Sequence, residues 1–259
     1  MHSAPTLPRT ALITGVGRRR NIGSAIARGL VADGFDLALS WSAQYDQRVN
    51  REHSDVELLA QELREAGARV ELLPGDLSDP EVPAALVEAA REAIGPLGAL
   101  VMCHCESVDS SILDTTVESF DRHYAVNVRA TWLLLKAFAE QVEPGIDTPG
   151  GAVIALTSDH TVHNLPYGAT KGALDRLVLA GTRELADRGI RTNVINPGPI
   201  DTGWMTEEIR AACAAATPGG ELGGPQTVAD LVRFLLSEQG GWIRGQLLFS
   251  NGGFHTPAV

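Results

Sequence analysis

The sequence predicts an α/β fold in which one doubly wound parallel sheet carries helices on both faces. Apolar stretches of strand length alternate with stretches of helical periodicity along most of the chain. The expected strands are continuous apolar runs, as burial on both faces of a parallel sheet requires. A glycine-rich turn also joins the first expected strand to the first expected helix.

In the first half of the chain, each expected element follows from its apolar pattern. The expected strands are Thr10–Thr14, Asp36–Leu39, Val70–Leu73 and Ala99–Cys103. The expected helices are Gly23–Ala32, His53–Ala66, Glu81–Ile94, Val117–Val126 and Ala130–Val142. His53–Ala66 illustrates the pattern, because its apolar residues Val56, Leu59 and Leu63 recur at helical spacing. Trp41–Ser54 matches neither period and is expected to be irregular.

The second half continues the alternation. Strands are expected at Gly151–Leu156, Thr192–Ile195 and Gly245–Phe249, and helices at Tyr167–Ala186 and Val228–Leu236. Thr217–Pro225 is rich in Gly and Pro and is expected to be an irregular segment that closes over a substrate. The absence of a repeat or a domain-length linker indicates one domain spanning residues 1–259.

Composition narrows the class of partner and the compartment. Lys+Arg 21 against Asp+Glu 32 gives a formal net charge of −11, which makes nucleic acid and anionic membranes poor partners. Three cysteines give no disulfide framework and suit a reducing compartment. Met1–Arg9 lacks a signal-peptide pattern, and no apolar run reaches the roughly 18 residues of a membrane span. A cytoplasmic protein is expected.

The first turn has the composition of a dinucleotide site. Thr14, Gly15 and Gly17 precede three arginines, and Asn21-Ile22-Gly23 opens the helix. Glycine lets the backbone approach a pyrophosphate, which the amides and dipole at a helix N-terminus then favour. The alternative is an ordinary glycine turn.

The arginines favour NADP(H) over NAD(H), although NAD(H) stays possible. A ribose 2′-phosphate needs a cationic partner, which Arg18, Arg19 or Arg20 would supply, whereas a 2′-hydroxyl favours a carboxylate after the second strand. That strand ends with Ser40 and Ser42 nearby and no acid before Asp46. The alternative for the arginines is a solvated loop. Asp76, after the third strand, is interpreted either as an adenine contact or as a turn or N-cap residue.

Tyr167 and Lys171 are four residues apart, which places both on one helix face. A tyrosine of pKa about 10 is a poor proton shuttle near neutral pH, and a nearby ammonium lowers that pKa. Ser158 ends the fifth strand, at the sheet edge where α/β proteins bind ligands. Asn127 lies in a helical stretch.

With these motifs the sequence resembles the short-chain dehydrogenase/reductase family, which has a Rossmann-type fold, from Thr10 to Phe254. The resemblance extends to 3-oxoacyl-[acyl carrier protein] reductase-like members. It rests on the Thr14–Gly23 turn, Asp76, Asn127, Ser158, Tyr167 with Lys171, the Asn196–Thr202 stretch and the Trp242–Phe254 stretch.

The resemblance implies a catalytic set of Asn127, Ser158, Tyr167 and Lys171. Tyr167 would protonate the carbonyl oxygen, Ser158 would polarise it, and Lys171 would lower the Tyr167 pKa and hold the nicotinamide ribose. Asn127 would hold a water that relays protons. The implied cofactor-binding set is Thr14, Gly15, Gly17, Arg18, Arg19, Arg20, Asn21, Ile22, Gly23, Ser40, Ser42, Asp76, Leu77, Cys103, Tyr167, Lys171, Pro197, Gly198, Ile200 and Thr202.

Some positions depart from the family pattern or carry weaker signals. Where the family commonly has Asn-Asn-Ala-Gly after the fourth strand, this chain has Met102-Cys103-His104-Cys105. Cys103, His104 and Cys105 suggest a metal, but no second cysteine pair completes the ligands, so none is expected. His160 and Trp204 are candidate substrate contacts, with ordinary loop and lid packing as the alternative.

The sequence therefore predicts an NADP(H)-dependent oxidoreductase that reduces a ketone, such as a 3-oxoacyl group, to a secondary alcohol. The alternatives are an NAD-dependent secondary alcohol dehydrogenase and a non-catalytic dinucleotide-binding sensor. The partner is a small carbonyl or alcohol substrate. The resemblance also implies a homotetramer or homodimer, with Leu133, Ala137, Leu177 and Gly181 on the packed helix faces.

Overall fold

A computed structural model describes residues 7–145 and 150–255 of the chain. Its centre is a seven-stranded, wholly parallel sheet in the order β3-β2-β1-β4-β5-β6-β7. The strands are β1 Thr10–Thr14, β2 Asp36–Trp41, β3 Val70–Pro74, β4 Ala99–Met102, β5 Gly151–Leu156, β6 Ile190–Asn196 and β7 Gln246–Phe249. The predicted doubly wound α/β class is confirmed. The strand order reverses between β1 and β4, which is where such sheets bind ligands.

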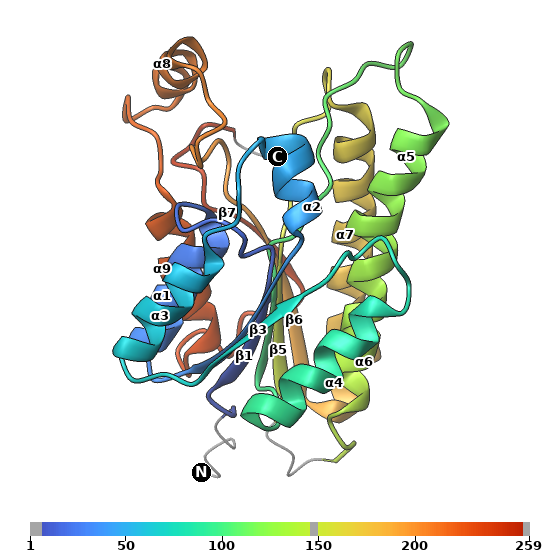
Figure 1. Ribbon diagram of the computed structural model, residues 1–259, viewed down its shortest axis with the longest axis vertical. Coiled ribbons are helices and arrows are strands. Elements are labelled where there is room, and N and C mark those ends of the chain that lie inside the picture. The colour runs from blue at the N-terminus through green and yellow to red at the C-terminus, as the bar shows by residue number, and fades with distance from the viewer. Residues whose placement is uncertain (1–6, 146–149, 256–259) are drawn as a thin grey trace.

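Helices cover both faces of the sheet (Figure 1). One side carries α1 Ile22–Ala32, α3 Val56–Glu65 and α9 Pro225–Leu236. The other carries α4 Val82–Ile94, α6 Ala130–Glu140 and α7 Leu165–Glu184. The remaining helices are α2 Ala43–Tyr45, α5 Val117–His123, α8 Glu207–Ala216, the π-helices η1 Asp46–Asn50 and η2 Tyr124–Arg129, and the 3₁₀ turn η3 Ala186–Arg188.

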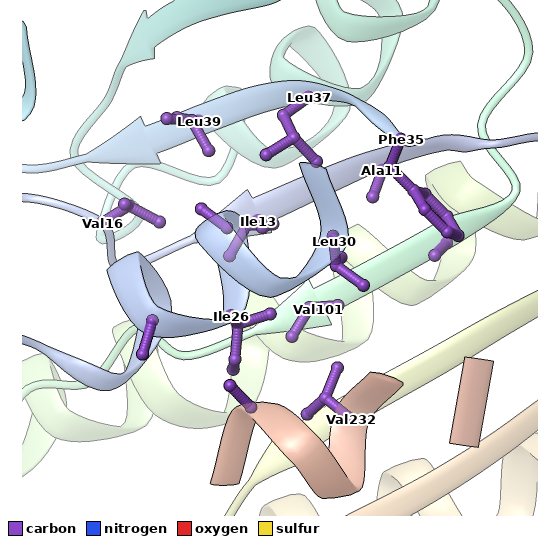
Figure 2. Close-up of a cluster of buried hydrophobic side chains, with 14 of the residues drawn as sticks. Ala11, Ile13, Val16, Ile26, Leu30, Phe35, Leu37, Leu39, Val101 and Val232 are labelled. Atoms are coloured by element: carbon purple, nitrogen blue, oxygen red, sulfur yellow. The ribbon is translucent and has the colours of Figure 1, made fainter. Parts of the chain in front are cut away.

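The strands divide their side chains between two cores. Ala11 and Ile13 of β1 join one cluster with α1, whereas Leu12 joins the opposite cluster with α4 and α6. Alternation of this kind follows from the two-residue period of a strand. Figure 2 shows the first cluster, in which Ile26 of α1 and Val232 of α9 point toward the sheet. Because both faces are buried, the strands read as continuous apolar runs.

Two differences from the sequence prediction lie near the carboxyl edge of the sheet. Trp41–Ser54 is not irregular throughout, because α2 and η1 occupy much of it. Ser42 caps this short structure by accepting a hydrogen bond from the Tyr45 amide at 3.3 Å. Helix α8 was not predicted, since none of its residues is buried and it lacks a core-facing stripe. Thr217–Pro225 is irregular as predicted until α9 begins at Pro225.

Gly181 does not lie on an outer helix face. It is buried on α7, where an added Cβ would lie 2.9 Å from Thr192 Cγ2 on β6. Leu133, Ala137 and Leu177 are partly exposed. Gly181 is therefore removed from the expected subunit contact. Within the described residues, no helix combines the length and the apolar character that a membrane crossing needs.

Phe138 supplies a test of the second core. Its side chain is fully buried on α6, and a Cβ on Gly151 would lie 2.7 Å from its Cε1 atom, so ring and strand fit without a gap. We predict that Phe138→Ala lowers the free energy of unfolding by about 3–5 kcal/mol, measured by urea denaturation. Leu113→Ala is the control, because Leu113 is 95% exposed. Equal stabilities of the two variants would contradict the packing.

Candidate active site

Ser158 and Tyr167 meet at the carboxyl edge of the sheet. Ser158 follows β5, and Tyr167 lies in the first turn of α7, which begins at Leu165 with Pro166 near its start. A proline there fits the helix, because the first amides have no intrahelical acceptor. The Tyr167 hydroxyl lies close enough to Ser158 for the serine side chain to lower the pKa of the phenol. The two oxygens that the sequence proposes for one substrate atom are thus adjacent.

The Lys171 ammonium lies close to Tyr167 but is directed elsewhere. Its Nζ is 5.5 Å from the centroid of the Tyr167 ring and donates to the Leu156 carbonyl at 2.8 Å. Burial raises the pKa of Tyr167, and the bond to Ser158 offsets this only in part. Burial also lowers the pKa of Lys171. In this arrangement desolvation dominates the Tyr167 pKa, and the lowering of that pKa by Lys171 stays a prediction.

Asn127 lies on the π-helix η2 and ties two elements together. Its Oδ1 accepts from the Glu106 amide at 2.7 Å, and its Nδ2 donates to the Glu106 carbonyl and to Thr170 Oγ1, both at 2.9 Å. Its own carbonyl accepts from Thr131 Oγ1 at 2.8 Å. The side-chain amide thus already has protein partners. A water held by Asn127 would bind its backbone carbonyl, together with the Thr131 hydroxyl.

The glycine turn lies directly against β4. A Cβ on Gly15, whose φ is 78°, would come within 2.6 Å of the Cys103 carbonyl carbon, so the close approach requires glycine. Asn21 caps α1 by accepting from the Ser24 amide at 2.8 Å, and its Nδ2 donates to the Gly15 carbonyl at 2.9 Å. The turn therefore presents the N-terminus of α1, including the amides of Ile22 and Gly23, at the sheet edge.

The three arginines are all engaged by carboxylates. Arg18 faces Glu52, with Nη1 and Oε2 3.4 Å apart, and Arg20 also pairs with Glu52. Arg19 pairs with Glu62 at 3.0 Å. The hydrogen bond from Arg28 and, to a smaller extent, that from Arg19 lower the pKa of Glu62 to about 2. These arginines are not a simple solvated loop, since each has an internal anionic partner.

The proposed cofactor contacts at the ends of β2 and β3 make hydrogen bonds or ion pairs within the protein. Ser40 is buried within β2, whereas Ser42 is partly exposed, caps α2 as an acceptor and keeps its hydroxyl proton for a further partner. Asp76 accepts from the Ser78 amide at 2.9 Å and pairs with Arg122 at 3.2 Å. Asp76 thus makes the contacts of a turn residue, and the adenine contact stays a prediction. Leu77 beside it is buried in the second core.

Sequence reasoning missed the side chains of the Tyr45 turn. The Tyr45 hydroxyl lies 3.9 Å from the Cys105 sulfur, close enough to Tyr167 for the two phenols to interact electrostatically. Asp46 is buried against Gly17, and burial raises the pKa of its carboxyl. In Figure 1 α2 lies over the same end of the sheet as the glycine turn that joins β1 to α1. The segment that was expected to be irregular therefore supplies a wall of the site.

Glu106 is a second residue that the sequence did not identify. Its carboxylate is 2% exposed and pairs with Arg48 of η1 at 2.6 Å and with Arg122 of α5 at 3.3 Å. A buried carboxylate is stable only when it is paired in this way. Glu106 thus fastens the Tyr45 turn and α5 to the end of β4. No local pattern marks it, because its partners are distant in sequence.

The Cys103-His104-Cys105 stretch holds no metal cluster. Over residues 7–145 and 150–255, no three His, Cys, Asp or Glu side chains are arranged to hold an ion. His104 Nδ1 instead lies 2.7 Å from Thr14 Oγ1, and burial lowers the pKa of His104 to about 3. Burial raises the pKa of the Cys103 thiol to about 12. Burial thus keeps Cys103 and His104 neutral.

The segment after β6 forms the other side of the carboxyl edge of the sheet. Pro197 lines a cavity of about 250 Å³ together with the turn after β7, and Gly198 packs closely on Asn251. Ile200 is buried in the first core, and the Thr202 carbonyl accepts from Arg18 at 3.3 Å. The side chains of His160 and Trp204 are exposed, and Trp204 Nε1 donates to the Ile200 carbonyl at 2.9 Å.

Known proteins resemble the chain over nearly its whole length. The family described as enoyl-(acyl carrier protein) reductase matches residues 15–255. The uncharacterized oxidoreductase YjdA of Bacillus subtilis is 34% identical, over 95% of this chain and 96% of that protein. The NADPH-dependent aldehyde reductase-like protein of Arabidopsis thaliana chloroplasts is 31% identical, over 97% of each. A Burkholderia cenocepacia short chain dehydrogenase solved with NADP superposes with a TM-score of 0.82 at 28% identity, over 96% of this chain and 98% of that one.

The buried His104 predicts a pH dependence of stability. Its folded-state pKa, about 3, lies below its ordinary value of 6.5, so the unfolded chain binds a proton that the folded chain refuses. Stability should fall as the pH falls from 6.5 toward 3. Between about pH 7.5 and about pH 5, we expect wild type to lose about 2 kcal/mol more than His104→Asn in urea denaturation. Parallel pH profiles for the two proteins would contradict a neutral, buried imidazole.

Proposed function

Because the chain belongs to the short-chain dehydrogenase/reductase family, we propose that it reduces a ketone to a secondary alcohol with NADPH, using Tyr167 as the acid. The chain is an NAD(P)-dependent oxidoreductase, and the choice of cofactor, substrate and direction is what the proposal adds. The observation that carries it is that the Tyr167 hydroxyl and Ser158 lie close together beside the buried Lys171.

The residues at the sheet edge fit a dinucleotide. Gly15 packs without a Cβ against the end of β4, and the capped α1 presents its first amides there, which suits a pyrophosphate. Arg18 also has a buried Nε without a hydrogen-bond partner, so it retains donor capacity for an anion. Thr14–Gly23 and Pro197–Thr202 would hold the two ends. When bound, the dinucleotide supplies the hydride that is transferred to the carbonyl carbon.

Tyr167 and Ser158 share the substrate oxygen in the proposed mechanism. Ser158 donates a hydrogen bond to the carbonyl oxygen and stabilises the negative charge that develops there. Tyr167 donates its proton to the same oxygen, which completes the alcohol. Burial raises the pKa of Tyr167, so the phenol keeps at neutral pH the proton that the reductive direction consumes.

Lys171 and Asn127 serve as the supports of this pair. The Leu156 carbonyl fixes the Lys171 ammonium on the same helix face as Tyr167. From there the ammonium would bind a ribose hydroxyl and return a proton to Tyr167. Asn127 ties the Glu106 backbone to α7 through Thr170, so its role is to position the edge of β4 against the catalytic helix.

NADPH is preferred over NADH in this proposal because of the arginine turn. The NADPH-dependent name of the Arabidopsis relative and the NADP in the Burkholderia structure support it. The substrate is a small ketone, such as a 3-oxoacyl group. We propose a cytoplasmic homotetramer or homodimer, in which the half-exposed Trp132 joins Leu133 and Ala137 on the outer face of α6.

Tyr167→Phe tests the proposal. Loss of the hydroxyl should lower kcat/KM for NADPH-dependent ketone reduction by about 10²- to 10⁴-fold, because proton donation is lost. The measurement is NADPH absorbance with a panel of aliphatic, aromatic and 3-oxo ester ketones. Tyr124→Phe is the matched control, since Tyr124 is partly exposed on η2 and packs on Phe120.

Direct titration of NADPH by fluorescence accompanies the assay. Tyr167→Phe should still bind NADPH, which separates lost chemistry from lost folding. Full activity of Tyr167→Phe would refute the assigned acid. Binding of NADPH by wild type without turnover of any ketone would favour the sensor, and turnover of alcohols with NAD alone would favour the NAD-dependent dehydrogenase.

A further inference from the structure

A cavity beside the glycine turn is lined by cations and acids together. It measures about 480 Å³ and is bordered by Arg18, Arg19, Arg20, Glu52, His53 and Asp55. The segment from Glu52 to Asp55 holds the glycine turn in place. Ser54 Oγ donates to the Gly17 carbonyl at 2.8 Å, and the Asp55 amide donates to the same oxygen at 3.1 Å. The cavity is thus a defined part of the cofactor end.

Glu52 bridges two of the arginines. Its Oε2 lies 3.4 Å from Arg18 Nη1, while its other oxygen pairs with Arg20. Both guanidinium groups also reach the segment after β6: Arg18 Nη1 donates to the Thr202 carbonyl at 3.3 Å, and the Arg20 guanidinium packs on Gly203. One carboxylate therefore holds two cations at the point where an anionic ligand would enter.

Arg18 is only weakly satisfied by these partners. Its side chain is 14% exposed, and its Nε is buried without a hydrogen bond, 3.6 Å from Asp46 Oδ1. Its contacts with Glu52 and Thr202 are longer than the roughly 2.7–2.9 Å of good charge-assisted bonds. A phosphate has more acceptor oxygens than a carboxylate and would use these donors better.

We propose that Glu52 is an internal competitor for a phosphate of the dinucleotide and thereby sets the affinity for the cofactor. This inference rests on the proposed function, since it assumes that NADP(H) binds at this edge. In the nucleotide-free protein Glu52 pairs with both Arg18 and Arg20. On binding, the phosphate takes the guanidinium groups, and the Glu52 carboxylate moves into solvent, which its 34% exposed side chain already reaches.

Competition has a consequence opposite to that of an ordinary supporting residue. If only the fraction of molecules with released arginines binds the phosphate, the apparent Kd is the intrinsic Kd divided by that fraction. Removing the competing charge raises the fraction and tightens binding. A residue that merely positions the arginines would weaken binding when removed.

Glu52→Gln is the test, with Glu57→Gln as matched control. Both changes remove one negative charge, and the exposed Glu57 has no ion pair within the part of the chain that the structure describes. Kd values for NADPH and NADH are measured by fluorescence at one fixed ionic strength. We expect Glu52→Gln to lower the Kd for NADPH by about threefold, because a partly exposed ion pair is lost, while Glu57→Gln leaves it unchanged.

Comparing the change in Kd for NADPH with that for NADH shows which phosphate the arginines bind. A gain confined to NADPH places the 2′-phosphate at the arginines, and an equal gain for NADH places the pyrophosphate there. Both results support competition by Glu52. An unchanged or higher Kd for both cofactors overturns it. Thermal melting checks that the variant is folded, and Glu52→Asp, which withdraws the carboxylate by one methylene, replaces it if it is not.

These results are separable from the proposed function. If wild-type protein binds neither NADPH nor NADH, the proposed function fails together with the inference. If wild type binds and reduces a ketone but Glu52→Gln does not bind more tightly, only the competitor role of Glu52 is lost.

Discussion

The parallel pairing of β4 with both β1 and β5 is the constraint on which the site depends. It brings the ends of three strands side by side at the reversal of the strand order, so the residues after Thr14, Met102 and Leu156 share one edge. The missing Cβ of Gly15 lets the turn pack on Cys103. The start of α7, which follows β5, then places Tyr167 beside Ser158.

The acidic chain uses its arginines internally around this edge. Arg48 and Arg122 both pair with the buried Glu106, and the arginines of the glycine turn pair with Glu52 and Glu62. Ion pairs between partly exposed side chains contribute little to stability, but they fix long side chains in place. In this molecule they join segments that lie far apart in sequence. The same pairs mean that the cations of the glycine turn already have partners within the protein.

The sequence was sufficient for the sheet because burial on both faces leaves a local pattern. β1 and β5 begin and end where the apolar runs do. That Ser158, Tyr167 and Lys171 lie close together was also predictable, since Ser158 follows a strand end and the other two lie in the first turns of a helix. Tyr45, Asp46 and Glu106 were not, because each acquires its place through contacts distant in sequence. Helix α8 was missed for the related reason that it buries none of its residues.

Burial of the catalytic pair also bears on how its proton is restored. Once Tyr167 has donated its proton, a phenolate and the Lys171 ammonium would both be charged in a site that disfavours charge. Transfer of a proton from the ammonium to the phenolate removes both charges. Because burial raises the pKa of Tyr167 and lowers that of Lys171, it favours this transfer. Both side chains lie on one face of α7, with Nζ 5.5 Å from the centroid of the tyrosine ring. In the proposed mechanism the lysine would therefore act as a proton reservoir for the desolvated phenol.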